Sequence, residues 1–279
     1  MSASKMTIGN VIIIALSDGK LSRVIVESFP GYQTQEWKCG CSAPGYAPDF
    51  QLNLGSFLVR SGGRTILVDT GIGSRPPDDS SDTWGLLLTD FEKQGLDVAQ
   101  VDTVFMTHMH YDHAGWNLRK ENGKLVPTFP NARYIGNARD WAFFSQRPDA
   151  QESYNYQPLS VEPLQEMGLL DLVDGEHSIT TELTAFPTPG HTPGHMSILI
   201  SSQGEKGIIL GDVAHHPFQV QETGWGHRAD IDPDGAIETR KAVMDRIEAE
   251  GLRVAAGHFP APGFGEIIRL EGKRYWKAL

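Results

Sequence analysis

The hydrophobic and polar positions of the chain form short runs of β-strand character separated by polar turns. Apolar, β-branched runs at 11–16 and 21–26 flank a Ser-Asp-Gly-Lys segment, whose residue types are typical of a hairpin turn. A second hairpin is expected where an alternating run at 54–60 meets 65–68 across a Ser-Gly-Gly-Arg turn. The pattern therefore predicts that the chain begins with two antiparallel strand pairs.

Beyond these hairpins, strands and helices share the chain. Helices are expected at 82–94, 138–144 and 234–250, and strands at 101–106, 133–135, 183–186, 196–200, 207–210 and 253–256. The last helix has an acidic start and a stop at Gly251. This order predicts an α+β fold with two similar β-rich halves, whose sheets pack on each other with helices outside. Without any linker of distinct composition, residues 1–279 are expected to form one domain.

Composition narrows the class of partner. The chain has 279 residues, 39% of them hydrophobic, and its 24 Lys and Arg against 35 Asp and Glu give a net charge of −11. These values exclude disordered and collagen-like classes, and the acidic balance argues against nucleic acid and membrane surfaces as partners. We expect a small-molecule substrate. Cys39 and Cys41 are expected to be free thiols in a surface loop, and without a signal-type segment a cytoplasmic location is the expectation.

Candidate chemistry is concentrated directly after the strand expected at 101–106. His108, His110, Asp112 and His113 follow it within six residues. His108 and His110 are two residues apart and project to the same side of an extended segment, whereas Asp112 and His113 turn toward a neighbouring point. Such a loop can serve two adjacent metal ions.

Three further candidate ligands lie at or near the ends of other expected strands. His191 lies in a Pro-Gly-His-Thr-Pro-Gly-His turn, Asp212 follows the strand at 207–210, and His258 follows the strand at 253–256. With the first cluster they make five imidazoles and two carboxylates, a donor set suited to two divalent ions. His195, in the same turn as His191, is expected to support a ligand rather than to be one.

These motifs, from His108 to His258, resemble the metallo-β-lactamase superfamily of dinuclear metallohydrolases. The resemblance implies a four-layer αββα sandwich with two divalent metal ions, Zn²⁺ in the first place and Fe or Mn as alternatives, at one edge between the sheets. It also implies that His108, His110 and His191 hold one ion, that Asp112, His113 and His258 hold the other, and that Asp212 bridges them.

Within the superfamily the sequence looks closest to the acyl-homoserine lactonases and the methyl-parathion-hydrolase-like branch. The familiar lactonases have tyrosine three residues after the bridging aspartate, whereas this chain has His215 there. The expected reaction is attack of a metal-bridging hydroxide on a lactone or ester, with a phosphotriester as a further option. Asp112 and His215 are the catalytic candidates, because either can supply a proton to the leaving oxygen.

Other residues near the motifs have weaker signals. Trp116, Phe218 and Phe264 are expected to line a substrate pocket, as is Trp225. Asp69, at the end of an expected strand, is expected either to form a turn or to hydrogen-bond to a ligating histidine. His177 and His227 have no cluster around them and are expected to be ordinary residues.

Two alternative functions remain open on the sequence. One is a thioesterase similar to glyoxalase II, although the chain ends at Leu279, shortly after His258. The other is an iron-dependent oxidoreductase similar to a persulfide dioxygenase, since His and Asp ligands do not select between iron and zinc. The resemblance to lactonases also leads us to expect a homodimer.

Overall fold

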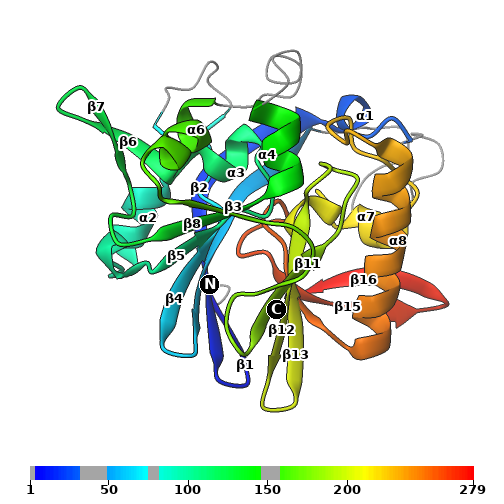
Figure 1. Ribbon diagram of the computed structural model, residues 1–279. Coiled ribbons are helices and arrows are strands. Elements are labelled where there is room, and N and C mark those ends of the chain that lie inside the picture. The colour runs from blue at the N-terminus through cyan, green and yellow to red at the C-terminus, as the bar shows by residue number, and fades with distance from the viewer. Residues whose placement is uncertain (1–3, 32–48, 75–81, 146–157) are drawn as a thin grey trace.

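The fold is a pair of facing β-sheets flanked by helices (Figure 1). The computed structural model describes residues 4–31, 49–74, 82–145 and 158–279. The predicted thiol loop with Cys39 and Cys41 lies outside these residues. Within them, no helix has the length and apolar composition needed to span a bilayer.

The first sheet is built from the N-terminal half of the chain, with strand order β1-β2-β3-β4-β5-β8-β9. Its pairs from β4 through β9 are parallel, and the others are antiparallel. A separate pair, β6 with β7, lies beside it. The strands are β1 Lys5–Ile8, β2 Val11–Val24, β3 Asp49–Ser61, β4 Arg64–Val68, β5 Thr103–Phe105, β6 Leu118–Glu121, β7 Lys124–Pro127, β8 Arg133–Asn137 and β9 Leu170–Val173.

The second sheet is built from the C-terminal half in sequential order, β10 to β16, with only β13 and β14 parallel. Its strands are β10 His177–Ser178, β11 Leu183–Pro187, β12 Met196–Ser202, β13 Glu205–Ile209, β14 Arg253–Ala255, β15 Phe264–Leu270 and β16 Lys273–Ala278. The helices of both halves are α1 Ile25–Ser28, α2 Leu87–Lys93, α3 Tyr111–Ala114, α4 Ala138–Ser145, α6 Pro158–Glu166, α7 Phe218–Gln221 and α8 Pro233–Glu250, with 3₁₀ turns η1 Val98–Gln100, η2 Gly115–Asn117 and η3 Gly211–Val213.

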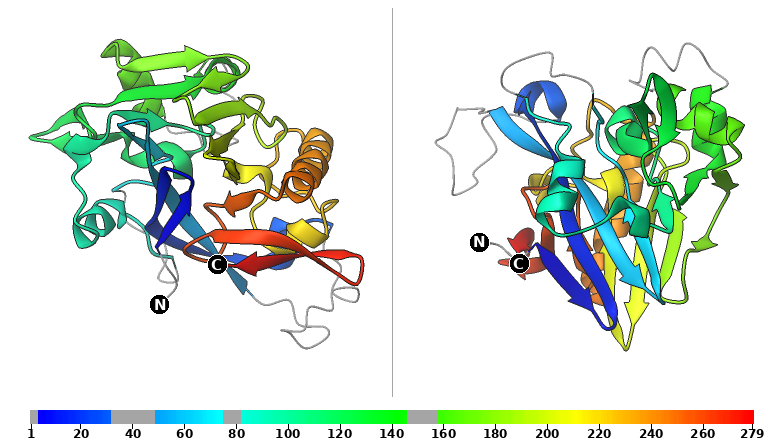
Figure 2. Two further views of the ribbon diagram at one scale, coloured as in Figure 1. Left: turned by 90° about the horizontal axis from the view of Figure 1, so that it is seen from below. Right: turned by 90° about the vertical axis from the view of Figure 1, so that its left-hand side faces the viewer.

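The core lies between the sheets, where apolar side chains of both halves meet. Residues such as Ile13, Val59 and Phe105 of the first sheet form one buried cluster with Ile198 and Ile209 of the second. A second cluster joins the first sheet to α2 and α6, and a third joins the second sheet to α8. The views in Figure 2 show the two sheets facing each other with helices outside. The predicted α+β sandwich with two β-rich halves is confirmed.

The predicted first hairpin is wrong, because 11–24 is one long strand. β2 pairs with β3 along its length and is interrupted only by an irregularity between Ser17 and Lys20. There the buried Asp18 carboxylate accepts hydrogen bonds from Ile72 N and Leu87 N, each at 2.8 Å. The turn-type residues therefore form a bulge that turns Asp18 inward, where it satisfies backbone donors of two loops.

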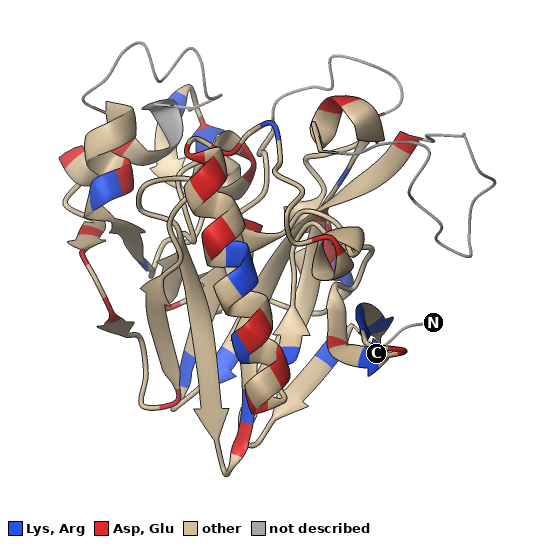
Figure 3. Ribbon diagram, turned by 90° about the vertical axis from the view of Figure 1, so that its right-hand side faces the viewer, with Lys and Arg blue, Asp and Glu red and all other residues tan. Residues whose placement is uncertain are grey.

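The long helix α8 follows its sequence signals closely. Asp232 caps it, its side chain accepting from Gly235 N at 3.0 Å, and Pro233 occupies the first turn. Gly251 ends it with φ of 63°, a left-handed conformation that glycine adopts readily. Its buried residues, Val243 and Ile247 among them, face the second sheet, and Figure 3 shows charged residues along the outward face.

Two other boundaries differ from the prediction. The helix expected at 82–94 begins only at Leu87, because Thr83 forms a β-bridge with Lys20 and Gly85 has φ of 80°. The terminal hairpin of β15 and β16 was not predicted, since its partly exposed strands carry charges on both faces. Phe264, at the start of β15, is buried between the sheets.

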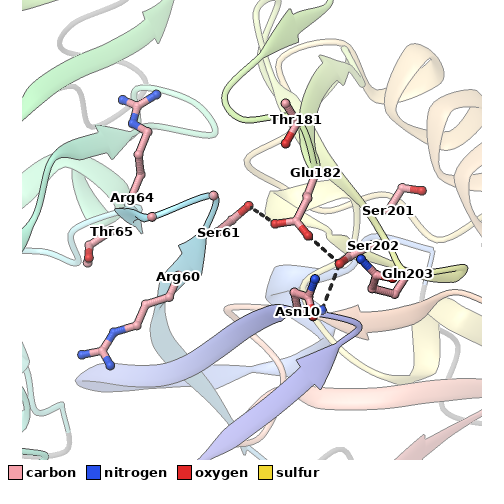
Figure 4. A pocket seen from close by; sticks show the side chains of 12 residues that line it. Asn10, Arg60, Ser61, Arg64, Thr65, Thr181, Glu182, Ser201, Ser202 and Gln203 are labelled. Carbon is pink, nitrogen blue, oxygen red and sulfur yellow. Dashed lines mark hydrogen bonds between the residues drawn. The ribbon is translucent and has the colours of Figure 1, made fainter.

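At the end of the sandwich that carries the β1–β2 and β12–β13 turns, a carboxylate joins the two sheets. Glu182, just before β11, accepts hydrogen bonds from Ser61 Oγ of β3 at 2.7 Å and Ser202 Oγ of β12 at 2.5 Å. Asn10 N donates to the same Ser202 hydroxyl at 2.9 Å. These groups line a pocket of about 740 Å³. Figure 4 shows them, with the side chains of Arg60 and Arg64 turned away from Glu182. These hydrogen bonds lower the pKa of Glu182.

We expect Glu182→Gln to lower the thermal unfolding midpoint at pH 7 by about 2–4 °C, since a hydrogen bond of this kind contributes roughly 1 kcal/mol. Because the pKa of Glu182 is lowered in the folded protein, its ionised form stabilises the fold fully at pH values above 4.5, the ordinary pKa of a glutamate. This contribution is lost as the pH falls through the lower pKa of the folded state. The difference between wild type and variant should therefore shrink in acid. Calorimetry at several pH values measures the unfolding midpoints, with the exposed Glu176→Gln as control. A midpoint difference that does not depend on pH would contradict a role for the ionised Glu182 carboxylate.

Candidate metal centre

The predicted ligands converge because they follow strands that end at the same edge of the two sheets. His108 and His110 follow β5, Asp212 lies in η3 after β13, and His258 follows β14. In each sheet the strands concerned are parallel to a neighbour, β5 to β4 and β14 to β13. Carboxyl ends of parallel strands meet at one edge, so the loops of both halves are brought together.

Six of the seven predicted ligands form two groups of three. In the first, His110 Nδ1 lies 3.1 Å from His108 Nε2 and 2.9 Å from His191 Nε2. In the second, His258 Nε2 lies 3.2 Å from His113 Nε2 and 3.7 Å from Asp112 Oδ2. Each group offers three donor atoms within 4.8 Å of one another, which is close enough to hold one metal ion.

Asp212 lies between these two groups. Its Oδ2 is 3.6 Å from His108 Nε2 and 3.2 Å from His191 Nε2, and on the other side 3.3 Å from His113 Nε2 and 3.1 Å from His258 Nε2. Both groups therefore share one carboxylate.

Hydrogen bonds behind the rings orient several of these histidines. The Nδ1 atoms of His113 and His191 each lie 2.9 Å from a carboxylate, Asp69 Oδ2 and Asp230 Oδ1 respectively, and His258 Nδ1 lies 2.8 Å from the Asn53 carbonyl. Because these acceptors hold a proton on Nδ1, the Nε2 atoms point inward. Of the two roles expected for Asp69, the structure therefore provides the hydrogen bond to a histidine of the cluster, His113.

The buried carboxylate and imidazoles shift each other's pKa values. Burial alone would raise the pKa of Asp212, but the surrounding imidazoles, His113 foremost, hold it well below its usual value. Burial lowers the pKa of His108 and His110, whereas for His191 the carboxylates of Asp212 and Asp230 outweigh burial and raise the pKa to about 9. A cation that binds His191 must therefore displace a proton.

The chemistry of this donor set fits divalent metal ions. Asp212 Oδ1 is buried without a hydrogen-bond partner among the described residues. Several imidazole nitrogens also face one another at about hydrogen-bond distance, and not all of them can find a proton donor at once. A buried carboxylate oxygen and converging nitrogen lone pairs are costly unless a cation satisfies them.

His195 and His215 flank the cluster differently. His195 Nε2 accepts from Asp212 N at 2.8 Å and its Nδ1 lies 2.9 Å from Thr188 Oγ1, so both ring nitrogens are engaged in supporting the loops. His215 Nε2 lies 3.2 Å from Asp212 Oδ2, at the edge of the cluster. Burial lowers the pKa of His215 to about 4, so it is neutral at neutral pH.

A cavity of about 370 Å³ opens beside the cluster. The structure does not bring the predicted aromatic side chains to it. Trp116 donates from its indole to Asp18 Oδ1 at 2.8 Å, Phe218 is buried against Phe29, and Phe264 lies in the core between the sheets. The described lining includes residues of both groups and also Leu21, Arg23, Leu52, Tyr111, His215, His227 and Arg228.

Sequence reasoning missed the residues that support the site from a distance in the chain. The buried Arg240 of α8 donates to Asp230 Oδ2 at 3.4 Å and to the Val213 carbonyl at 2.7 Å, and so holds both the partner of His191 and the turn that carries Asp212. His227, expected to be an ordinary residue, lies in the cavity wall. Nothing in the residue types or spacing of these positions indicates such roles.

Comparison with known proteins assigns the family. Residues 56–258 match the metallo-beta-lactamase superfamily, and the chain belongs to it. N-acyl homoserine lactonase AttM of Rhizobium radiobacter is 24% identical over 184 residues, which span 60% of this chain and 66% of that protein. The family and fold predicted from the motifs are confirmed.

Two solved structures resemble the whole chain. AidC, a dizinc quorum-quenching lactonase, superposes with a TM-score of 0.82 at 23% identity, covering 100% of this chain and 97% of that one. The hydrolase AbOPH has a TM-score of 0.82 at 26% identity, covering 100% and 98%. The family match and the histidine and aspartate groups described above confirm the predicted class, a metal-dependent hydrolase, and support divalent metal ions.

We expect Asp69→Asn to weaken Zn²⁺ binding about 10- to 100-fold, because loss of a carboxylate behind a ligating histidine typically has that effect. Asn also tolerates the positive φ of 60° at this position, so the fold should be retained. Competition with a chelating dye measures the affinity, and circular dichroism checks the fold. The exposed Asp234→Asn is the matched control; equal affinities of both variants would show that Asp69 only forms a turn.

Proposed function

We propose that this protein is a dinuclear zinc hydrolase that opens lactones or cleaves esters of small molecules. The observation that carries the proposal is the position of Asp212, whose single Oδ2 lies within 3.1–3.6 Å of histidines from both three-residue groups. A carboxylate placed between two complete donor sets supports a bridging role.

In this proposal His108, His110 and His191 hold one ion, and Asp112, His113 and His258 hold the other. Bound ions would supply Lewis acidity and an ionised water near neutral pH. The chain supplies the placement of these ligands and the walls of the cavity beside them.

The protein groups that would handle protons are Asp112 and His215. Asp112 lines the cavity and is partly exposed, so it can pass a proton to a leaving oxygen. His215 is neutral at neutral pH, and this supports a role as hydrogen-bond donor to a substrate oxygen more than as a proton store.

The choice of a lactone or ester rests on the cavity and on the relatives. Leu21 and Leu52 give the cavity an apolar surface beside the ligands, which suits an acyl or alkyl group. AttM is named an N-acyl homoserine lactonase and AidC a quorum-quenching lactonase. Lactones are therefore the first substrates to test.

The proposal is tested with zinc-reconstituted protein and a panel of a lactone, an aryl ester, a thioester and a phosphotriester. We expect the lactone or the aryl ester to give the highest kcat/KM. Preference for the thioester would favour a glyoxalase II-like enzyme. Iron as the metal in protein purified without added metal, together with thiol oxidation, would favour the dioxygenase alternative.

We expect two metal ions per chain by elemental analysis, and His108→Ala or Asp212→Ala should abolish hydrolysis because each removes a ligand. His177→Ala, on β10, should stay near wild type. Equal losses in all three variants would indicate a general folding defect, and one ion per chain would contradict the dinuclear centre.

His215→Phe should slow an aliphatic lactone by at least about 100-fold, with a much smaller effect on a nitrophenyl ester. The reason is that an aliphatic alkoxide needs a hydrogen bond or proton to leave, whereas a nitrophenolate leaves without one. Steady-state kinetics and metal content are measured together. An equal loss on both substrates would assign His215 to pocket shape, and loss of metal would make it a ligand.

A further inference from the structure

The side chain of His227 is held between two rings at the wall of the cavity. It lies in the segment between α7 and α8, and its ring stacks on His215 with centroids 3.8 Å apart and planes 18° apart. The ring of Phe29 packs against the His227 ring, with centroids 5.1 Å apart. Because the side chain also lines the cavity beside the metal ligands, its position is fixed by packing while part of it remains accessible.

Hydrogen bonding determines which nitrogen of His227 carries the proton. Nδ1 accepts from Ala229 N at 3.4 Å, so the ring proton belongs on Nε2. Burial lowers the pKa of His227 well below its usual value, which keeps the ring neutral with this single N–H. Nε2 has no hydrogen-bond partner among the residues that the structure describes. The side chain therefore offers a donor to a molecule in the cavity.

The backbone around His227 is anchored to the interior. His227 N donates to Asp230 Oδ2 at 2.8 Å, and the buried Arg240 donates both to this oxygen at 3.4 Å and to the Trp225 carbonyl at 2.9 Å. A donor on such a support is preorganised, so it loses little freedom when a ligand binds.

His227 lies outside the reacting centre itself. It belongs to none of the groups that could hold a metal ion, and it is His215 rather than His227 that contacts Asp212. An acceptor that reaches His227 would therefore lie on a part of the substrate away from the scissile bond. A neutral N–H donor suits an uncharged acceptor such as an amide or ketone carbonyl.

We propose that His227 is a substrate-binding residue that donates a hydrogen bond from Nε2 to a carbonyl substituent of the substrate outside the scissile bond. This inference rests on the proposed lactonase function, and it adds that the enzyme selects lactones bearing such a carbonyl. His227 thereby determines specificity, whereas His215 acts at the reacting group.

The test is His227→Phe, which keeps an aromatic ring on His215 but removes the N–H. Substrates are N-hexanoyl-homoserine lactone, which has an amide carbonyl, and γ-decalactone, which has none. We expect kcat/KM to fall about tenfold for the amide-bearing lactone, the equivalent of one hydrogen bond, and to change less than twofold for the alkyl lactone. His227→Ala, which also removes the stacked ring, should slow both lactones.

Binding provides a readout that is independent of turnover. Calorimetry with the ring-opened products, N-hexanoyl-homoserine and 4-hydroxydecanoate, should show the same selective loss in His227→Phe, with metal content unchanged. His177→Phe, a matched change on β10, should bind both as wild type does. Equal losses for both compounds, or no loss for the amide, would overturn the proposal. If wild type opens neither lactone, the proposed function fails, while the binding ratio still decides the role of His227.

Discussion

The interaction on which the site depends is the burial of the Asp212 carboxylate among imidazoles from both halves of the chain. Its Oδ2 lies within 3.6 Å of five histidine nitrogens. Burying a carboxylate is costly unless positive charge or donors surround it. The two sheets must therefore face each other in one relative position, since His108 and His113 come from the first half and His191 and His258 from the second.

The relative position of the two sheets is maintained by polar contacts that cross the sandwich at both ends. Near the site, Asn53 of β3 donates from its amide to the Gly257 carbonyl at 2.8 Å, and its own carbonyl accepts from His258. At the opposite end, Glu182 joins β3 to β12. Between them, the apolar core supplies most of the stabilising burial but is non-directional. The hydrogen bonds are directional, so they fix the positions of individual side chains such as His258.

Support for the second half reaches the site through α8. Arg240 carries a buried charge from that helix to Asp230, which in turn orients His191. The same arginine holds the carbonyl of Val213 beside Asp212. A helix packed on the outside of the sheet thus positions groups at the metal centre, because one guanidinium can donate to several loops at once.

The sequence by itself indicated the candidate ligands, their order and the strands that they follow, because histidines and aspartates at strand ends combine a local spacing rule with specific coordination chemistry. It also offered Asp69 as either a turn residue or a partner of a histidine, and it indicated α8 with its stop at Gly251, which depends on residues close in the sequence. Only the tertiary structure decided that 11–24 forms one bulged strand, that Trp116, Phe218 and Phe264 pack away from the cavity, and that His227, Asp230 and Arg240 belong to the site. The physical reason is that hydrophobic burial has no direction along the chain, so an aromatic residue beside a motif fits a core as well as a pocket. Which of these environments surrounds it is set by contacts between segments far apart in sequence.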